Sequence, residues 1–217
     1  TLSLFTSPQE EHTFRSTQLP AVIGEAVDFF ANTPLSPLPP PFRFLGPGVY
    51  ALYYLGDFDL YSLLSAANRQ ECKWPIYVGK AVPPGWRTGR EALSETATLY
   101  SRLREHSVSI ERANNLVGDH FVCRYMFLAD AESDLIGTVE AALIRTYQPI
   151  WNTIIDGFGN HDPGNGRYNQ SPSEWDVLHP GRSWVKNLKG EPPDIQEIRN
   201  ATLEELQRRF RSSTTAS

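Results

Sequence analysis

The chain is poor in cysteine and has no long apolar run. Only Cys72 and Cys123 occur among 217 residues, too few for a disulfide scaffold or a zinc site. We expect both to be reduced packing residues of a cytosolic protein. No uninterrupted apolar stretch reaches the roughly 20 residues of a transmembrane helix. The first residues, TLSLFTSPQEEHTF, lack the basic and apolar segments of a signal peptide. We therefore expect no membrane partner.

Positive charge is also limited. Twenty Lys and Arg face 25 Asp and Glu, a formal net charge of −5, which taken alone argues mildly against a nucleic-acid partner. A local basic face can still coexist with an acidic remainder. The cations gather along the chain in four groups: Lys80, Arg87 and Arg90; Arg102 and Arg104; Arg182, Lys186 and Lys189; Arg208, Arg209 and Arg211. Each group by itself is most simply a solvated surface.

The hydrophobic content, 40%, is enough for one buried core, so one domain with extensions is expected. Before residue 45, a short helical pattern, AVIGEAVDFFA, precedes a proline-rich extended connector. Valine, leucine and tyrosine predict three strands, and apolar spacing predicts three helices in the middle of the chain. The predicted strands cover 48–55, 75–81 and 120–128, and the predicted helices cover 57–70, 94–108 and 133–147. The last two helices begin with possible N-caps, Ser94 and Ser133.

The C-terminal part has little periodicity. From residue 156 to about 193 it is rich in Gly, Pro, Asn, His and Trp, and such long irregular segments are more often functional than idle. A helical tail follows, in which Thr202 and Glu205 have capping-box spacing. We divide the chain into an arm with its connector, a central domain with an extra helical stretch, and a C-terminal recognition region with its helix. Their ranges are 1–45, 46–156 with the extra stretch at about 57–74, and 157–217.

One carboxylate stands in an apolar helical stripe. Successive helix residues turn by about 100°, so Glu140 shares its side of the helix with Ile136, Leu143, Ile144 and Tyr147. A carboxylate in such surroundings is costly unless something neutralises it. Glu140 either reaches water at the edge of the stripe or serves as a metal ligand or an acid in a partly dry site. The helix alone leaves both readings open.

Two further polar features are weak when taken alone. Arg102 and His106 are four residues apart and share one helix face. A guanidinium beside an imidazole suits an anionic substrate, although most such pairs are surface residues. Asn152 follows the proline that ends the Glu140 helix, in QPIWN, where asparagine is usually a turn residue. Asn152 becomes informative only through its order along the chain relative to the other polar features.

Two tyrosine motifs complete an ordered set. GVY at 48–50 and YVG at 77–79 place tyrosines on two predicted strands. Together with RLREH on one helix, the glutamate on the next and then PIWN, they resemble the GIY-YIG nuclease superfamily over roughly residues 46–155. Valine replaces isoleucine in both tripeptides, and the gap between them is unusually long. The arm, this insertion and the irregular tail resemble the type II restriction endonuclease branch, most of all enzymes that cut a GC-rich six-base palindrome.

The resemblance implies an α+β fold with a small central antiparallel or mixed sheet flanked by helices. It implies an endonuclease that hydrolyses double-stranded DNA with one Mg²⁺, or Mn²⁺ in its place. The six implied catalytic residues are Tyr50, Tyr77, Arg102, His106, Glu140 and Asn152. Glu140 would hold the metal, Arg102 would clamp the phosphate, and Asn152 would orient a water or buttress the site. Tyr50 would take the proton of the attacking water and pass it to His106, with Tyr77 positioning the water or the phosphate.

DNA recognition would come from the same domain and its extensions. A G·C-rich site would be read by Lys or Arg at guanine, and a palindrome would match a two-fold homodimer in which each subunit cuts one strand. The arm and the C-terminal helix are candidate dimer or wrapping elements, and a bacterial cytoplasm follows from the analogy. The candidate DNA-binding residues are Lys80, Arg87, Arg90, Arg104, Asn165, Arg167, Asn169, Arg182 and Lys186.

Three other readings compete with restriction. The first is a GIY-YIG nuclease of repair, junction resolution or homing. The second is a different nuclease chemistry at HSVSIERANN or HDPGNGRYN, but neither has a convincing metal-ligand arrangement. The third is a DNA-binding module that has lost catalysis, against which the six filled positions argue. Sequence-specific cleavage of plain duplex DNA to fixed ends separates restriction from the first of these.

Overall fold

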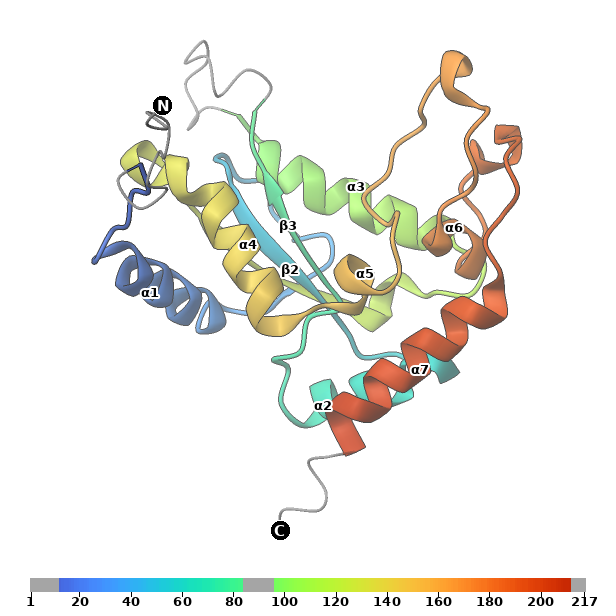
Figure 1. Cartoon of the computed structure of the whole chain (residues 1–217), viewed down its shortest axis with the longest axis horizontal. Helices are drawn as coiled ribbons and strands as arrows, with labels where there is room; N and C mark the ends of the chain where they lie inside the picture. Colours follow the sequence, from blue (N-terminus) through green and yellow to red (C-terminus); the bar gives the residue numbers. More distant parts are fainter. Residues whose placement is uncertain (1–11, 84–95, 212–217) are drawn as a thin grey trace, which may run out of the picture.

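The computed structural model describes residues 12–83 and 96–211. Within these ranges the chain is an α+β fold in which helices flank one antiparallel sheet (Figure 1). Three of the expected basic and capping residues, Arg87, Arg90 and Ser94, lie outside the described residues. No helix in the described ranges is long and apolar enough to cross a membrane. Both cysteines are free, and Cys123 is buried, as the sequence predicted.

The sheet has four strands in the order β1-β4-β2-β3. Their bounds are β1 Ser36–Pro37, β2 Gly48–Tyr54, β3 Tyr77–Ala81 and β4 Phe121–Phe127. The three longer strands fall where β-branched and aromatic residues predicted them. The short β1 was not predicted as a strand, because its prolines indicated only an extended connector. Every residue of β2 is buried, because the strand pairs on both sides with a neighbour and a hydrophobic core packs on each of its faces.

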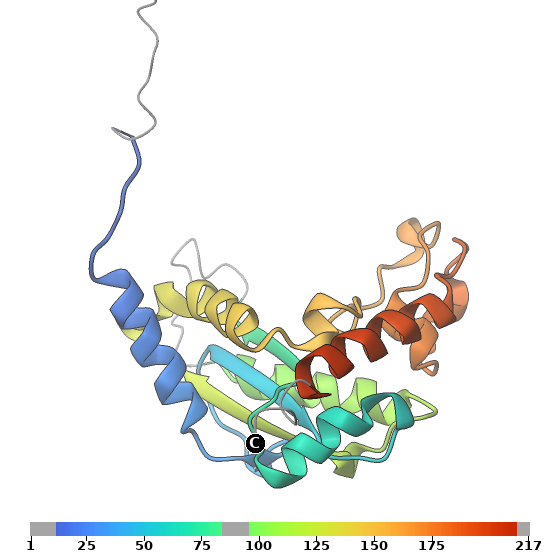
Figure 2. The ribbon, with the colours of Figure 1, turned by 60° about the horizontal axis from the view of Figure 1, so that its bottom comes forward.

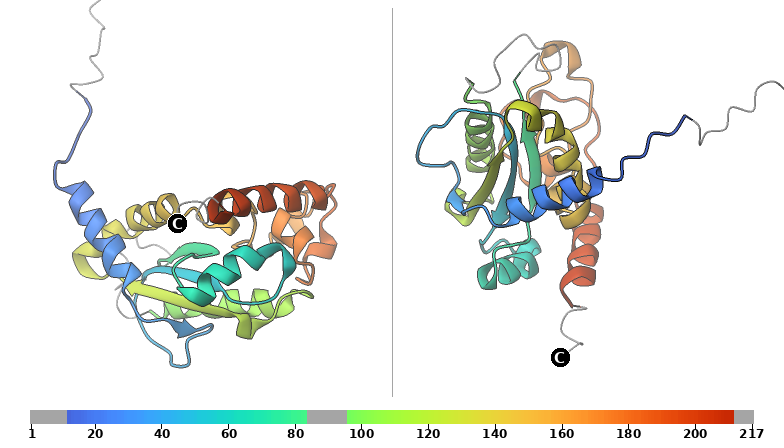
Figure 3. Two further views of the ribbon diagram at one scale, coloured as in Figure 1. Left: turned by 90° about the horizontal axis from the view of Figure 1, so that it is seen from below. Right: turned by 90° about the vertical axis from the view of Figure 1, so that its left-hand side faces the viewer.

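Side chains of β2 alternate between two helical layers, as the period of two in a strand requires. Val49, Ala51 and Tyr53 belong to a core shared with α1, Leu19–Ala31, and α4, Ile136–Tyr147. The alternate residues, Tyr50 among them, face the opposite core, which includes α3, Thr98–Arg112. The two layers on either side of the sheet can be followed in the right-hand view of Figure 3.

The remaining elements lie toward one end of the sheet. The insertion between β2 and β3 forms a 3₁₀ turn, Asp59–Tyr61, and then α2, Ser62–Gln70. Helix α2 packs against α7, Ile195–Arg211, so residues far apart in sequence lie side by side (Figure 2). Between α4 and α7 the chain forms α5, Ile150–Thr153, α6, Glu174–Leu178, and two 3₁₀ turns, Asn165–Arg167 and Val185–Asn187.

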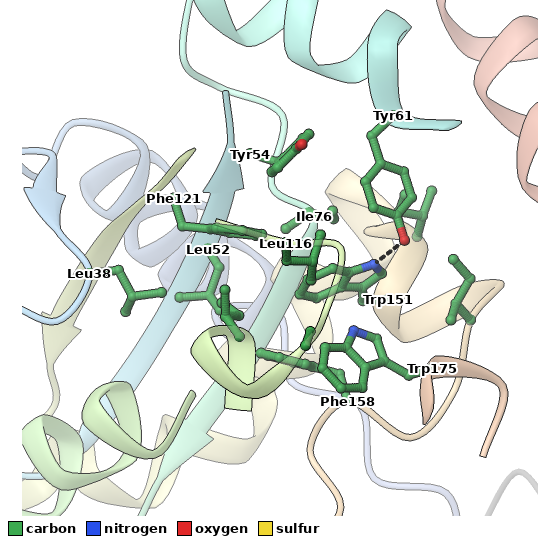
Figure 4. Packing of buried hydrophobic residues seen from close by; sticks show 14 of the residues in the cluster. Leu38, Leu52, Tyr54, Tyr61, Ile76, Leu116, Phe121, Trp151, Phe158 and Trp175 are labelled. Carbon is green, nitrogen blue, oxygen red and sulfur yellow. Dashed lines mark hydrogen bonds between the residues drawn. The ribbon is translucent and has the colours of Figure 1, made fainter. Parts of the chain in front are cut away.

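Aromatic side chains fill the core beneath α5 and α6. The Trp151 ring lies 4.5 Å from Phe158 and 5.7 Å from Trp175 between centroids. Its indole Nε1 donates to the Tyr61 hydroxyl at 2.9 Å, so the buried N–H is satisfied. Figure 4 shows these rings converging from the insertion, α5 and the C-terminal region. The irregular tail is therefore packed onto the domain through buried aromatic rings.

Two expected helix starts were wrong. Helix α3 begins at Thr98, with Ala97 preceding it, and not near residue 94. The chain before α4 is a 3₁₀ segment, Asp130–Leu135, in which Ser133 Oγ donates to the Asp130 carbonyl instead of capping α4. Serine side chains readily bond nearby backbone groups in this way, so a serine before an apolar stripe does not fix the first helical residue.

Candidate active site

Tyr50 and Tyr77 lie on adjacent strands and face the same core. Their ring centroids are 6.2 Å apart. Tyr50 pairs across the ladder with Gly79, and its phenol lies over the glycine, because a Cβ built there would stand 2.4 Å from Tyr50 Oη. The glycine of the YVG motif therefore makes room for the tyrosine of the GVY motif.

His106 on α3 contacts Tyr50 directly. The phenol oxygen and His106 Nε2 are 2.6 Å apart, and both side chains are almost fully buried, at 1% and 2% exposure. Burial, then the nearby Arg102, lower the pKa of His106 well below its usual range. Burial, then the neighbouring Tyr77, raise the pKa of Tyr50 well above its usual value. Both groups are thus neutral at pH 7, and the phenol can donate to an unprotonated Nε2.

Arg102 completes this cluster from the preceding turn of α3. Its Nη2 donates to the Gly159 carbonyl at 3.1 Å, and its Nη1 contacts Glu105 Oε2 at 2.9 Å and His161 Nε2 at 2.5 Å. Burial raises the pKa of Tyr77, while the Arg102 guanidinium acts in the opposite direction. A cation fixed beside two phenols favours negative charge at this point.

Glu140 on α4 is held by Lys80 on β3. The Lys80 Nζ lies 2.5 Å from Glu140 Oε2, and the glutamate side chain is 19% exposed. The apolar neighbours Ile136 and Leu143 are buried around the same stripe. The ion pair supplies the neutralisation that the sequence required, and it shows that this carboxylate accepts a cation. Glu140 is also close enough to Tyr50 to raise its pKa further, after burial and Tyr77.

A single carboxylate suits one kind of metal. Mg²⁺ commonly takes one or two protein carboxylates and completes its shell with waters and substrate phosphate. Among the residues that the structure describes, no group of three or more His, Cys, Asp and Glu could hold an ion. As a single, partly buried carboxylate, Glu140 would fit an ion of this kind.

Asn152 on α5 closes the edge of β3. Its Oδ1 accepts from the Val78 N–H at 2.8 Å, and its Nδ2 donates to the Val78 carbonyl at 2.9 Å. The next residue toward the N-terminus, Trp151, donates its backbone N–H to the Ile76 carbonyl at 2.9 Å. Asn152 thus holds the strand that carries Tyr77, and both ends of its amide are occupied. These contacts use one of the two Nδ2 N–H groups and one of the two Oδ1 lone pairs, as a side chain that buttresses the strand requires.

A family model described as the Eco29kI GIY-YIG domain matches residues 42–206. The chain belongs to this family. It is a family of type II restriction endonucleases, so the chain is a DNA-binding nuclease of the restriction type, and the α+β sheet is the GIY-YIG fold that the motifs implied. No curated protein sequence matches the chain.

A cationic hollow opens beside the site of this GIY-YIG domain. Its volume is about 590 Å³, and its lining includes Arg102, His106, Arg43, Arg104 and Arg112. Sequence reasoning did not select Arg43 or Arg112, because one belongs to the connector and the other to the last turn of α3. Nothing in their local spacing signals a shared surface. His161 also lines the hollow, although the sequence suggested HDPGNGRYN only as a rival nuclease site.

The expected DNA-binding residues of the GIY-YIG domain and its tail fall into different environments. Lys80 is engaged with Glu140. Five others are exposed: Arg104, Asn165, Arg167, Asn169 and Lys186. Exposed donors on the hollow and on the irregular tail are available to a long polyanion.

Arg182 does not fit the DNA-reading role that its sequence group suggested. The residue is only 4% exposed. Its guanidinium donates to Asp176 Oδ1 at 2.6 Å and to three backbone carbonyls between Gly157 and Asn160. A buried guanidinium with four internal bonds has one N–H left for any other partner. The charge spacing along the sequence could not reveal this burial, because the partners lie on other segments.

Proposed function

We propose that the protein is a sequence-specific type II restriction endonuclease. It hydrolyses phosphodiester bonds of double-stranded DNA at a short GC-rich palindrome, in a bacterial cytoplasm. The observation that carries the proposal is the 2.6 Å contact between Tyr50 Oη and His106 Nε2, with Arg102 and Glu140 beside it, in a chain of this family. A buried phenol–imidazole pair next to a guanidinium is suited to moving a proton near a phosphate.

The pair can activate water without a free phenolate. As the attacking water gives its proton to Tyr50 Oη, the phenol proton moves to His106 Nε2 through the existing contact. The water oxygen bonds to phosphorus, and the bond from phosphorus to the 3′ oxygen breaks. The 3′ oxygen leaves with the bonding electron pair and takes a proton from solvent, and His106 later returns its proton to solvent. This relay suits the raised pKa of Tyr50, which makes a standing phenolate scarce. The negative DNA phosphate stabilises the imidazolium that forms, whereas burial lowers the pKa of His106 and disfavours it.

The other residues orient and neutralise. Arg102 holds the scissile phosphate, as a planar guanidinium fork can, and Tyr77 positions the water or the phosphate beside it. Asn152 fixes the strand under Tyr77. Glu140 holds Mg²⁺, which when bound offsets the charge that develops on the phosphate and the leaving oxygen. Lys80, released from Glu140, contacts a DNA phosphate.

A palindromic site is matched by a homodimer. Large exposed apolar side chains support this, because several lie in the first 45 residues: Phe14, Leu19, Val22, Phe29, Leu35, Phe42 and Leu45. Exposed apolar side chains are typical of interaction surfaces when they form a contiguous patch. Residues 12–18 also run away from the body ahead of α1 (Figure 2). Sedimentation velocity on a palindromic duplex is expected to give two chains per duplex, and one chain per duplex contradicts the dimer.

The direct test is cleavage of bacteriophage DNA in Mg²⁺ by the wild type and by Glu140→Gln. The exposed Glu132 provides a matched control, Glu132→Gln. Discrete fragments from the wild type and the control, but none from Glu140→Gln or in EDTA, are expected. Sequencing the ends then gives the site. DNA that is bound but never cut contradicts the catalytic proposal, and cutting confined to branched substrates indicates a junction-resolving enzyme.

A further inference from the structure

Residues 157–161, which we name the wall segment, lie against three residues of the site. The Phe158 ring stacks on the His106 imidazole, with centroids 4.6 Å apart and an angle of 19° between planes. The same ring meets Tyr77 edge-on at 4.9 Å. The Gly159 carbonyl and His161 Nε2 both contact the Arg102 guanidinium. The wall segment therefore touches the residues proposed to clamp the phosphate and to receive the proton.

The wall segment is held from beneath by one side chain, Arg182. Its Nη2 donates to the Gly157 carbonyl at 2.9 Å. Its Nη1 donates to the Phe158 carbonyl at 3.2 Å and to the Asn160 carbonyl at 2.9 Å. Three carbonyls within four residues are thus fixed by one rigid fork. A lysine could not reproduce this geometry, because its ammonium is a point charge on a flexible stem.

Arg182 is itself locked in place. Its Nε donates to Asp176 Oδ1 at 2.6 Å, and the two side chains are 2% and 1% exposed. The guanidinium carbon lies 4.4 Å from the Trp175 ring centroid and 5.2 Å from that of Trp184. Asp176 Oδ2 in turn accepts from Ser173 Oγ at 2.7 Å. A buried ion pair is seldom better for stability than apolar packing. The buried arginine therefore points to a role in placing the wall segment.

We propose that Arg182 is a positioning residue, which through the wall segment holds Arg102 and His106 in the geometry for hydrolysis. The inference rests on the proposed function for its catalytic consequence. Arg102 has a long flexible side chain, and the Gly159 carbonyl gives it a fixed partner deeper in the site than Glu105, whose side chain is 53% exposed. His106 is kept in its plane by Phe158, whose neighbour in the core is Trp175 (Figure 4). A displacement of about 1 Å at such groups can cost about 100-fold in rate.

Two variants test this inference in different ways. Arg182→Lys keeps a cation opposite Asp176 but loses the fork that fixes the carbonyls. Gly159→Ala leaves Arg182 intact but introduces a Cβ 3.0 Å from Tyr77 Oη and 3.4 Å from Arg102 Nη2. Gly118→Ala is the matched control, because its Cβ meets only the Glu111 side chain, at 3.6 Å or more. Gly159→Ala also keeps the test informative should Arg182→Lys fold poorly.

The first readout separates binding from chemistry. DNA affinity is measured by fluorescence anisotropy without divalent metal, and the single-turnover cleavage rate is measured at saturating enzyme. We expect both test variants to bind DNA within about threefold of the wild type while cleaving at least tenfold more slowly, a loss within the range for misplaced catalytic groups. Gly118→Ala should match the wild type in both measurements. Equal cleavage rates in folded Arg182→Lys and wild type would overturn the inference.

The second readout needs no cleavage. The order parameter of the Arg102 Nε–H bond, from ¹⁵N relaxation of the free protein, should show a rigid side chain in the wild type. In Arg182→Lys it should fall toward flexible values, below about 0.6. If no DNA is cut even by the wild type, the proposed function fails while this measurement still decides the positioning claim. An unchanged order parameter in Arg182→Lys would contradict it.

Discussion

At the scale of single residues, Gly79 and Tyr50 form one unit across two strands. The phenol crosses the backbone of the glycine on its way to His106. Any larger residue at 79 must displace the ring, because real Cβ atoms do not approach an oxygen to 2.4 Å. The glycine of the YVG motif therefore leaves room for the hydrogen bond that the tyrosine of the GVY motif makes to His106.

Replacing Gly79 with alanine is expected to lower the cleavage rate by about 100-fold, because the phenol moves away from His106 Nε2. Overpacking of this kind also costs about 1–3 kcal/mol of stability. Single-turnover cleavage and urea unfolding measure the two effects separately. Gly24→Ala is the control, since nothing lies within 4 Å of its added Cβ. A cleavage rate for Gly79→Ala within twofold of the control would disprove the argument.

The motif order predicted which residues would meet, because GIY-YIG motifs occupy set places in one fold. Tyr50, Tyr77, Arg102 and His106 form one cluster, and Glu140 acts electrostatically on both phenols. The partners that tune the site were not predictable. Glu140 meets Lys80 across 60 positions of sequence, and the fork of Arg182 depends on carbonyls that carry no sequence signal.

At the scale of elements, α7 begins with a cap that the sequence reading missed. Asp194 Oδ1 accepts from the backbone N–H groups of Gln196 at 2.6 Å and Glu197 at 3.2 Å. The expected capping box at Thr202 was wrong. Thr202 is buried within the helix, and its Oγ1 donates to the Ile198 carbonyl. Capping-box spacing in the middle of an amphipathic repeat is a weaker signal for a helix start than an aspartate just before the repeat.

Asp194→Ala is expected to lower the free energy of unfolding by about 0.5–2 kcal/mol, the usual cost of losing an N-cap. Urea unfolding at pH 7 measures the change. Glu191→Ala removes the same charge from an exposed position and should alter stability far less. Equal effects of the two substitutions would indicate that charge, and not capping, is what matters at Asp194.

At the scale of the whole molecule, two neutral histidines are buried in one core. His106 bonds to Tyr50, and His179 lies 2.6 Å from the Tyr61 hydroxyl and 2.9 Å from Asn115 Oδ1. Burial, then Arg182, lower the pKa of His179 to about 3. Burial, then Arg102, lower that of His106 as well. The folded chain therefore resists protonation at both rings.

Acid should destabilise the protein earlier than carboxylate titration alone would. The unfolded histidines bind protons below about pH 6.5, whereas the folded rings do not. The free energy of unfolding should hence fall as the pH drops below about 6.5, by up to about 1.4 kcal/mol per pH unit for each ring, and the part due to His179 continues to about pH 3. Urea unfolding at pH 7.5, 6 and 5 measures the slope, and His179→Gln should make it shallower. Parallel slopes in the two proteins would contradict this account.

The closed edge of β3 has a consequence for handling the protein. An edge strand with free N–H and C=O groups is a template for pairing with other chains, and Asn152 occupies both groups of Val78. Substitutions at 152 thus expose the backbone N–H and C=O of Val78 at the sheet edge, and they also loosen the strand that carries Tyr77. Variants at Asn152 that lose activity are also expected to aggregate, which light scattering would detect. On expression, such variants are expected to form inclusion bodies.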